Sequence, residues 1–201
     1  MFALNGQRIL VPDEIYKLYR QISHIDAYIK FIYIFSTGFR ISEYNYVFDY
    51  PDMIDYDKRI IYFKDNEWDN IMRFRDRKIY LSRTDMNNVI LFIKLNERMN
   101  IKSYQLNRNL KLWAAKAGMD PTGIDSKALR RTRMAWLLAL FPQFENRIIS
   151  SIDFHQDVEP YRTVPFTLQD KLGMICMLGD WSGTNIPSNP ENKPDTALYT
   201  T

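Results

Sequence analysis

The chain has 201 residues, 46% of them hydrophobic, which is enough to bury one sizeable core, so we predict a single domain over residues 1–201. It contains no apolar run of about 18 residues or more and no signal-peptide pattern, and we therefore expect a soluble, cytoplasmic protein rather than a membrane-spanning or secreted one. A net charge of +3 and a pI near 8.8 do not by themselves indicate a nucleic-acid partner.

Cysteine and histidine are too scarce to suggest a disulfide or a metal site. Cys176 is the single cysteine, and because it lies in the apolar run from Leu172 to Leu178, we expect a buried core thiol and not a nucleophile. His24 and His155 are far apart and have no Cys or His neighbours at ligand spacing. The sequence therefore indicates neither a metal nor another cofactor.

The N-terminal part of the chain alternates periodic apolar segments with breaks, which predicts three helices. Pro12 and Glu14 suit the first turn of a helix whose apolar residues recur at helical spacing. The segment from Ile25 to Phe35 is so apolar and aromatic that we expect a helix buried on most faces. Gly38 belongs to the break that follows, and a short helix is predicted from Ile41.

Two β-branched and aromatic runs follow, from Arg59 to Lys64 and from Arg77 to Leu81. They flank a polar stretch that includes Asp65 and Asn66, which is typical of an antiparallel hairpin with a long connection. We expect this hairpin to form the sheet of the domain.

The remainder of the chain is predicted to be mainly helical. Ser82 or Thr84 is the expected cap of the first helix in this part. Apolar periodicity and the breakers Gly118 and Pro142 delimit four helical segments: Thr84–Asn96, Ser103–Ala117, Ser126–Phe141 and Thr167–Leu178. Residues 144–165 show no clear pattern, and the tail over residues 182–201, rich in Pro and Asn, is expected to be mobile. The predicted fold class is α+β, mainly α-helical with a small antiparallel β-sheet or hairpin.

Positive charge is concentrated in one part of the chain. Between Arg98 and Arg133, nine Lys or Arg against two acids give a local net charge of +7. Two interpretations of this segment stay open. It is either a surface that meets a polyanion or the solvated face of a helix, which is the usual role of a charge run.

Several separated stretches follow a recognisable order. The first is Thr37-Gly38-Phe39-Arg40-Ile41-Ser42-Glu43, and the second is Lys127-Ala128-Leu129-Arg130-Arg131-Thr132. Between them Lys64 ends the first predicted strand, and after them come Met177-Leu178-Gly179-Asp180-Trp181 and then Tyr199. Together these residues resemble the catalytic domain of the tyrosine recombinase (phage integrase) family.

The resemblance implies the tyrosine recombinase catalytic-domain fold over nearly the whole chain. It implies a site-specific recombinase of a mobile element that breaks and rejoins double-stranded DNA through a covalent 3′-phosphotyrosine, for DNA recombination and integration. It also implies assembly as a homo-oligomer on DNA and no metal or other cofactor. The residues that match the family's catalytic positions are Arg40, Lys64, Lys127, Arg130, Trp181 and Tyr199.

The chemistry of phosphodiester cleavage explains why these residue types are needed. Negative charge grows on the non-bridging oxygens, and the planar guanidinium forks of Arg40 and Arg130 suit two oxygens in a way that lysine does not. A tyrosine hydroxyl such as that of Tyr199 forms the covalent intermediate. A lysine such as Lys64 protonates the departing sugar oxygen as a general acid.

Each of these residues also has a plainer interpretation. Arg40 and Glu43 are spaced as an i,i+3 ion pair on a helix surface, and Arg130 fits a patch that contacts the DNA backbone away from the reacting atoms. Lys64 fits a solvated strand end, and Tyr199 is one of 13 tyrosines. The residues expected to contact DNA outside the reacting centre are Arg75, Arg77, Lys102, Arg108, Lys111, Arg131 and Arg133.

The sequence departs from the family pattern at several positions. Lys127 stands where histidine is usual, and Asp180 stands at the histidine of the third stretch, so Trp181 is the alternative occupant of that place. Tyr199 follows Asp180 by 19 positions, more than the family pattern has. The family's N-terminal core-binding domain has no counterpart in the chain, which is then a fragment or a minimal integrase.

These departures leave an alternative function open, a catalytically impaired DNA-binding protein on the same scaffold. The order of the stretches argues against an unrelated helical protein with chance matches. A mobile tail allows Tyr199 to act in its own protomer or in a neighbouring one, and we favour exchange between protomers because the extra length extends the reach of the tail.

Overall fold

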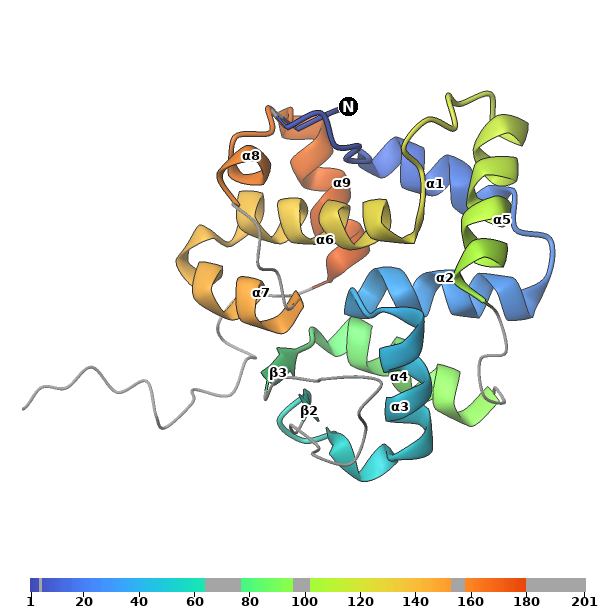
Figure 1. The fold of residues 1–201 in the computed structure, drawn as a ribbon. Helices are drawn as coiled ribbons and strands as arrows, with labels where there is room; N and C mark the ends of the chain where they lie inside the picture. The colour runs from blue at the N-terminus through green and yellow to red at the C-terminus, as the bar shows by residue number, and fades with distance from the viewer. Residues whose placement is uncertain (4, 64–76, 96–101, 153–157, 180–201) are drawn as a thin grey trace, which may run out of the picture.

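Figure 1 shows the fold of the chain in a computed structural model, which describes residues 1–3, 5–63, 77–95, 102–152 and 158–179. Within these ranges the protein is mainly helical with one small antiparallel sheet, so the predicted α+β class is confirmed. None of the helices in these ranges is long and apolar enough to cross a membrane.

The first three helices are those that the sequence predicts. α1 (Pro12–Arg20) has proline at its first position and acidic side chains in its first turn, both of which favour a helix N-terminus. α2 (Ile25–Thr37) ends at Gly38, whose φ of 70° lies in the left-handed region that glycine adopts readily. α3 (Ile41–Asp49) begins shortly afterwards.

The predicted hairpin forms the larger part of a three-stranded antiparallel sheet with the order β1-β2-β3. β2 (Ile60–Phe63) pairs with β3 (Arg77–Tyr80) in a register that places Ile61 opposite Ile79. The strand β1 (Ile54–Asp55) is not predictable from the pattern, because it has two residues and directly follows the short 3-10 helix η1 (Pro51–Met53).

Four later helices confirm the predicted segments to within a residue or two at each end: α4 (Arg83–Leu95), α5 (Ser103–Lys116), α6 (Ser126–Leu140) and α9 (Leu168–Leu178). Ser82 caps α4, since its Oγ accepts the backbone N–H of Asp85 at 3.0 Å. Pro142 follows the end of α6 and opens the 3-10 helix η2 (Pro142–Phe144).

Two more helices lie in the stretch for which no element was predicted. They are α7 (Glu145–Ile152) and α8 (Glu159–Arg162). Ile148 anchors the first and Tyr161 the second, and both side chains are fully buried. α7 has isoleucines at helical spacing but only eight residues, and α8 has four, so neither is long enough for apolar periodicity to indicate a helix.

α2 runs across the middle of the molecule (Figure 1). On one side of it lie α6 and α9 with α1, α5 and α8, and on the other lie α3, α4 and the sheet. α2 packs against both α4 and α6, and the buried apolar residues form one continuous core. α6 is central to that core, with Leu129, Met134 and Trp136 fully buried.

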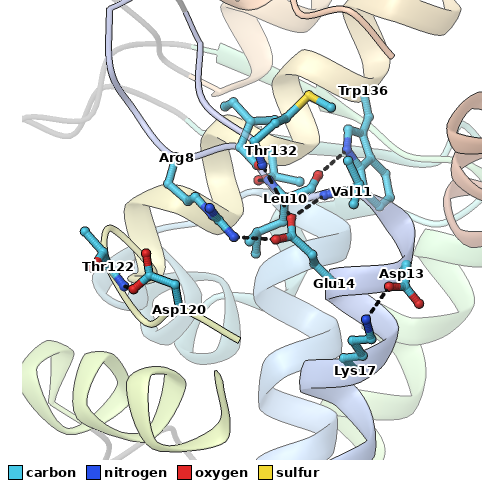
Figure 2. Close-up of polar contacts among 12 residues, drawn as sticks. Arg8, Leu10, Val11, Asp13, Glu14, Lys17, Asp120, Thr122, Thr132 and Trp136 are labelled. Carbon is cyan, nitrogen blue, oxygen red and sulfur yellow. Dashed lines mark hydrogen bonds and ion pairs between the residues drawn. The ribbon is translucent and has the colours of Figure 1, made fainter. Parts of the chain in front are cut away.

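α6 also holds the segment that leads into α1 (Figure 2). Thr132 accepts the backbone N–H of Leu10 at 2.9 Å, and Trp136 donates its indole N–H to the carbonyl of the same leucine at 2.9 Å. Glu14 adds an anchor, because it accepts the N–H of Val11 at 3.0 Å and pairs with Arg8. Thr132, the last residue of the second sequence stretch, therefore has a structural role.

The expectation of a buried Cys176 is wrong, because its side chain is exposed. The apolar run around it lies on α9, where helical spacing turns Met174 and Leu178 inward and leaves Leu172 and Ile175 57% and 49% exposed. An apolar run thus predicts the helix but not which of its faces is covered.

Candidate functional site

The turn between α2 and α3 contains the first sequence stretch, and its polar residues shape the backbone. Thr37 donates its hydroxyl to the carbonyl of Tyr33 at 2.8 Å and accepts the N–H of Phe39 at 3.2 Å. Gly38 takes a left-handed conformation that would strain a residue with a β-carbon. The Thr-Gly pair therefore ends α2 abruptly and redirects the chain.

The two residues after this turn lie in opposite environments. Phe39 is 1% exposed, with its ring centroid 5.6 Å from that of Tyr33 and 5.4 Å from that of Phe63. The side chain of Arg40 is 46% exposed. The buried ring thus fixes the point from which the neighbouring guanidinium reaches the surface.

The side chain of Glu43 is completely buried and contacts both the backbone and the guanidinium group of Arg40. One carboxylate oxygen accepts the backbone N–H of Arg40 at 2.8 Å, and the other lies 3.4 Å from the Arg40 guanidinium. The plainer interpretation, an i,i+3 ion pair between Arg40 and Glu43, is therefore confirmed as a pair, but it does not lie wholly on the surface, because the Glu43 side chain is 0% exposed. A buried carboxylate in this position fixes both the backbone and the side chain of Arg40 at the start of α3.

Arg130 connects the second sequence stretch to the first. It lies near the start of α6 and is half-buried, and its Nε donates to the carbonyl of Gly38 at 2.7 Å. Gly38 stands two residues before Arg40, although 92 positions separate it from Arg130. The two arginines predicted to share a phosphate therefore come from segments that are in direct contact.

The first turn of α6 adds positive charge beside Arg130. Lys127 is exposed there. Asp125 caps the helix by accepting the N–H of Ala128 at 2.7 Å, and it lies 3.7 Å from Arg131, whose side chain is 15% exposed. The helix dipole, which is positive at this end, adds to the charge of Lys127, and the carboxylate of Asp125 offsets part of it.

Some predicted residues fall outside the described residues: Lys64, Arg75, Trp181 and Tyr199. Arg77 is placed in β3, where its backbone pairs with Phe63, but its side chain is outside the described set. The structure thus brings Arg130, near the start of α6, into contact with Gly38, two residues before Arg40. The convergence of the catalytic candidates on one phosphate stays a prediction.

α5 presents a basic face. Lys102, just before its first residue, and Arg108 and Lys111 within it are all exposed, and the helix contains no Asp or Glu. Arg108 and Lys111 are three positions apart and therefore share a face. This exposure agrees with contacts to a polyanion and equally with a solvated face.

The prediction that Arg133 contacts DNA is wrong. Its side chain is 2% exposed and lies 2.8 Å from the carboxylate of Asp85, which is 1% exposed. A second guanidinium nitrogen donates to the carbonyl of Phe35 at 3.4 Å. A charge buried in this way does not reach a DNA phosphate unless the core unpacks.

Ser82 and Asp85 are buried polar residues. The sequence indicated Ser82 only as a possible helix cap and gave no particular role to Asp85. Both are 1% exposed, although polar residues at helix starts are usually solvated. The available signal was their position shortly after β3 and the buried Leu81 that follows it, because a buried strand delivers the next residues to the edge of the core. Nothing near Asp85 in the sequence indicates that its ion-pair partner is Arg133 on α6.

An aromatic pocket borders the end of α2 that leads into the first sequence stretch, since Phe35 and Ser36 line it. It has a volume of about 280 Å³ and its lining includes Tyr16, Tyr19, Tyr28, Phe31, Phe35 and Asn88. Burial, together with a hydrogen bond to Tyr19, raises the pKa of Tyr28 to about 12.

Comparisons with known proteins identify no family for the chain. No protein-family model matches it, and no curated protein matches it either. The functional assignment therefore depends on the sequence stretches and on the contacts that join them.

Proposed function

We propose that the chain is a tyrosine recombinase catalytic domain that binds double-stranded DNA and breaks and rejoins it through a covalent phosphotyrosine. The observation that carries the proposal is the 2.7 Å hydrogen bond from Arg130 to the carbonyl of Gly38, which joins the two stretches that hold the arginines. Chance matches to two motifs provide no reason for the matching segments to meet in the fold.

Arg40 and Arg130 act on one scissile phosphate in this proposal. Attack at phosphorus adds negative charge to the non-bridging oxygens, and two guanidinium groups already held by the protein stabilise that charge without reorganising. The buried Glu43 beneath Arg40 and the Gly38 carbonyl on Arg130 supply this preorganisation.

Tyr199 is the proposed nucleophile. Its oxygen forms a bond to phosphorus while the bond from phosphorus to the 5′ oxygen breaks, which leaves a 3′-phosphotyrosine and a free 5′ hydroxyl. The departing 5′ oxygen takes a proton from Lys64 or Lys127, and the phenol proton passes to solvent. Trp181 donates its indole N–H to a non-bridging oxygen. Attack by a 5′ hydroxyl on the phosphotyrosine reverses these steps and rejoins the strand.

Double-stranded DNA is the proposed partner, and several protomers assemble on it. Contacts to the DNA backbone position the duplex and carry no sequence information. The residues proposed for them are Arg75, Arg77, Lys102, Arg108, Lys111 and Arg131.

A second candidate function is DNA binding without cleavage. The observation that favours it is Asp180, whose negative charge at the histidine place of the third stretch would oppose a phosphate. The two functions share the DNA-binding surface and differ only in chemistry.

A covalent trap separates the two functions. A binding site is first selected from randomised duplexes with the Tyr199→Phe protein, which binds without reacting. Nicked suicide versions of the selected duplex are then incubated with wild type, Tyr199→Phe and Arg130→Ala, and covalent complexes are counted on a denaturing gel.

We expect a covalent complex with wild type, none with Tyr199→Phe and at most traces with Arg130→Ala, while all three proteins bind the duplex. Binding by wild type without any covalent complex establishes the second function. Absence of both binding and trapping rejects the proposal altogether.

A further inference from the structure

The buried ion pair between Arg133 and Asp85 calls for a physical explanation. Removing two charges from water is costly, and well-packed apolar residues in the same place are often neutral or stabilising. The pair, at 2.8 Å and with side chains 2% and 1% exposed, is therefore weak evidence for stability by itself. What charged groups add is a defined geometry, because their hydrogen bonds accept few arrangements.

On α6, hydrogen bonds from Arg133 and its neighbour Arg130 lead towards the first sequence stretch. Arg133 lies three positions after Arg130, so the two arginines lie on the same side of the helix. Arg130 donates to the carbonyl of Gly38 at 2.7 Å, and Arg133 donates to the carbonyl of Phe35 at 3.4 Å. Both contacts reach the last turn of α2 and the turn after it, which fixes α6 relative to the start of the Arg40 segment.

On α4, hydrogen bonds link Asp85 of the ion pair to the third sequence stretch. Asp85 donates its backbone N–H to the hydroxyl of Ser82 at 3.0 Å, and Ser82 donates that hydroxyl to the carbonyl of Leu178 at 2.9 Å. Leu178 is the last residue of α9 and directly precedes Gly179, so this chain of contacts joins the end of α9 to α6.

Gly179 shows how closely the end of α9 approaches α4. A β-carbon on it would lie 2.5 Å from the hydroxyl oxygen of Thr84, and its φ of +71° is one that residues with side chains rarely adopt. The third stretch is therefore seated on the first turn of α4, which is the turn that carries Asp85.

We infer that Arg133 and Asp85 are positioning residues that hold all three sequence stretches in one arrangement. Arg133 contacts Phe35, two residues before the first stretch on α2, and lies one turn after Arg130 of the second stretch. Asp85 is linked to the third stretch through Ser82 and Leu178. The inference rests on the proposed function, because the pair matters for chemistry only if Arg130 and the residues after Gly179 act on the same phosphate.

The test replaces both charges at once, with Arg133→Met and Asp85→Leu in one protein. Because no unpaired charge is left in the core, the double variant is expected to fold and to bind the selected duplex as wild type does. Single-turnover cleavage of the suicide duplex at saturating protein is expected to fall by about 100-fold, the effect of a misplacement of about 1 Å. A purely structural pair leaves the cleavage rate of folded, DNA-bound protein unchanged, and that result overturns the inference.

A matched control is the ion pair between Arg8 and Glu14 in the N-terminal segment, which is linked to the second stretch by way of the contacts of Val11 with Glu14 and of Leu10 with Thr132 (Figure 2). Arg8→Met with Glu14→Leu removes the pair between those residues, and this protein is expected to cleave at the wild-type rate once folded. If the Arg133 and Asp85 double variant does not fold, Arg133→Lys is used instead. It keeps the charge but not the fork that reaches both partners, and it is expected to fold and to cleave more slowly than wild type.

Amide hydrogen exchange provides a readout that does not depend on cleavage. The N–H of Gly179 donates to the carbonyl of Ile175 at 3.1 Å, and we expect it to exchange faster in the Arg133 and Asp85 variants than in the Arg8 and Glu14 control. Equal exchange rates overturn the inference. Failure of wild type to cleave, with this difference in exchange present, rejects the proposed function and leaves the structural coupling established.

Discussion

At the scale of single residues, Arg130 is oriented by a backbone carbonyl, that of Gly38 at 2.7 Å. A carbonyl holds a guanidinium group through its dipole and carries no net charge of its own. In the proposed function the positive charge of Arg130 meets a phosphate, whereas the guanidinium of Arg133 is bound to the carboxylate of Asp85 in the core.

Removal of that charge should be rescued by removal of the charge on the substrate. We expect Arg130→Ala to lose cleavage of the normal suicide duplex by about 100-fold or more, as when one preorganised donor is removed. The same protein should regain much of its activity on a duplex with an uncharged methylphosphonate at the scissile position. Quantifying covalent complex on both duplexes checks this, and a variant equally inactive on both argues against charge stabilisation by Arg130.

Tyr28 allows a prediction about alkaline pH. Burial and its hydrogen bond to Tyr19 raise its pKa from an ordinary value of 10.0 to about 12. The unfolded chain therefore ionises this tyrosine first as pH rises, so its stabilising contribution is complete below pH 10.0 and is lost as pH approaches about 12. Tyr28→Phe should weaken the decline of Tm with pH in that window. Parallel Tm curves for wild type and variant would show that Tyr28 titrates normally.

At the scale of elements, α5 is the helix whose charge is best placed for a polyanion. Its cations Arg108 and Lys111 are exposed, and no acid of its own offsets them. Among the residues of the +7 segment, Arg133 is buried and Arg131 is 15% exposed, so the charge that reaches the surface is smaller than the sequence suggests.

We predict that DNA binding through α5 is electrostatic and independent of sequence. The double variant Arg108→Ala with Lys111→Ala should reduce the slope of log K against log salt by about 2 and weaken binding to all duplexes alike. Lys17→Ala is the control, because its ammonium group is paired with Asp13 at 2.6 Å on α1. Equal slopes of log K against log salt for the α5 variant and wild type would mean that DNA does not contact α5.

The junction of α9 with α4 gives a second prediction at this scale. Gly179→Ala should lower the free energy of unfolding by about 3 kcal/mol, because backbone strain and overpacking against Thr84 add together. Gly118→Ala is matched to it, with a φ of +69° but nothing within 4 Å of the added carbon, and should cost only about 1 kcal/mol. Urea unfolding measures the free energy of unfolding of both variants. Equal losses of stability would mean that α9 and α4 shift apart at little cost to accommodate the added carbon.

At the scale of the whole molecule, the predictable part of the fold is the part with local causes. Helices α1 to α6 and α9 were predictable because caps, proline, glycine and apolar periodicity act over a few residues. The hairpin was predictable for the same reason. α7 and α8 were not, because each is held mainly by tertiary burial, of Ile148 and of Tyr161.

The candidate site likewise has features with local causes in the sequence and features that depend on tertiary packing. The turn that presents Arg40 follows from Thr37 and Gly38, which act locally. The burial of Glu43 and of Arg133 depends on how helices pack, and a charged residue in the sequence carries no mark of a partner such as Asp85, 48 positions away. Sequence reasoning therefore identified the cations but assigned one of them to the wrong environment.

In the proposed function the first two stretches build one phosphate site. This claim is tested most directly by the positions of the Arg40 and Arg130 guanidinium groups in a crystal structure of Tyr199→Phe bound to its selected duplex. We predict that both groups donate hydrogen bonds to the same scissile phosphate. Guanidinium groups more than about 12 Å apart, or bound to different phosphates, would contradict the claim, because one phosphate cannot span that distance with hydrogen bonds.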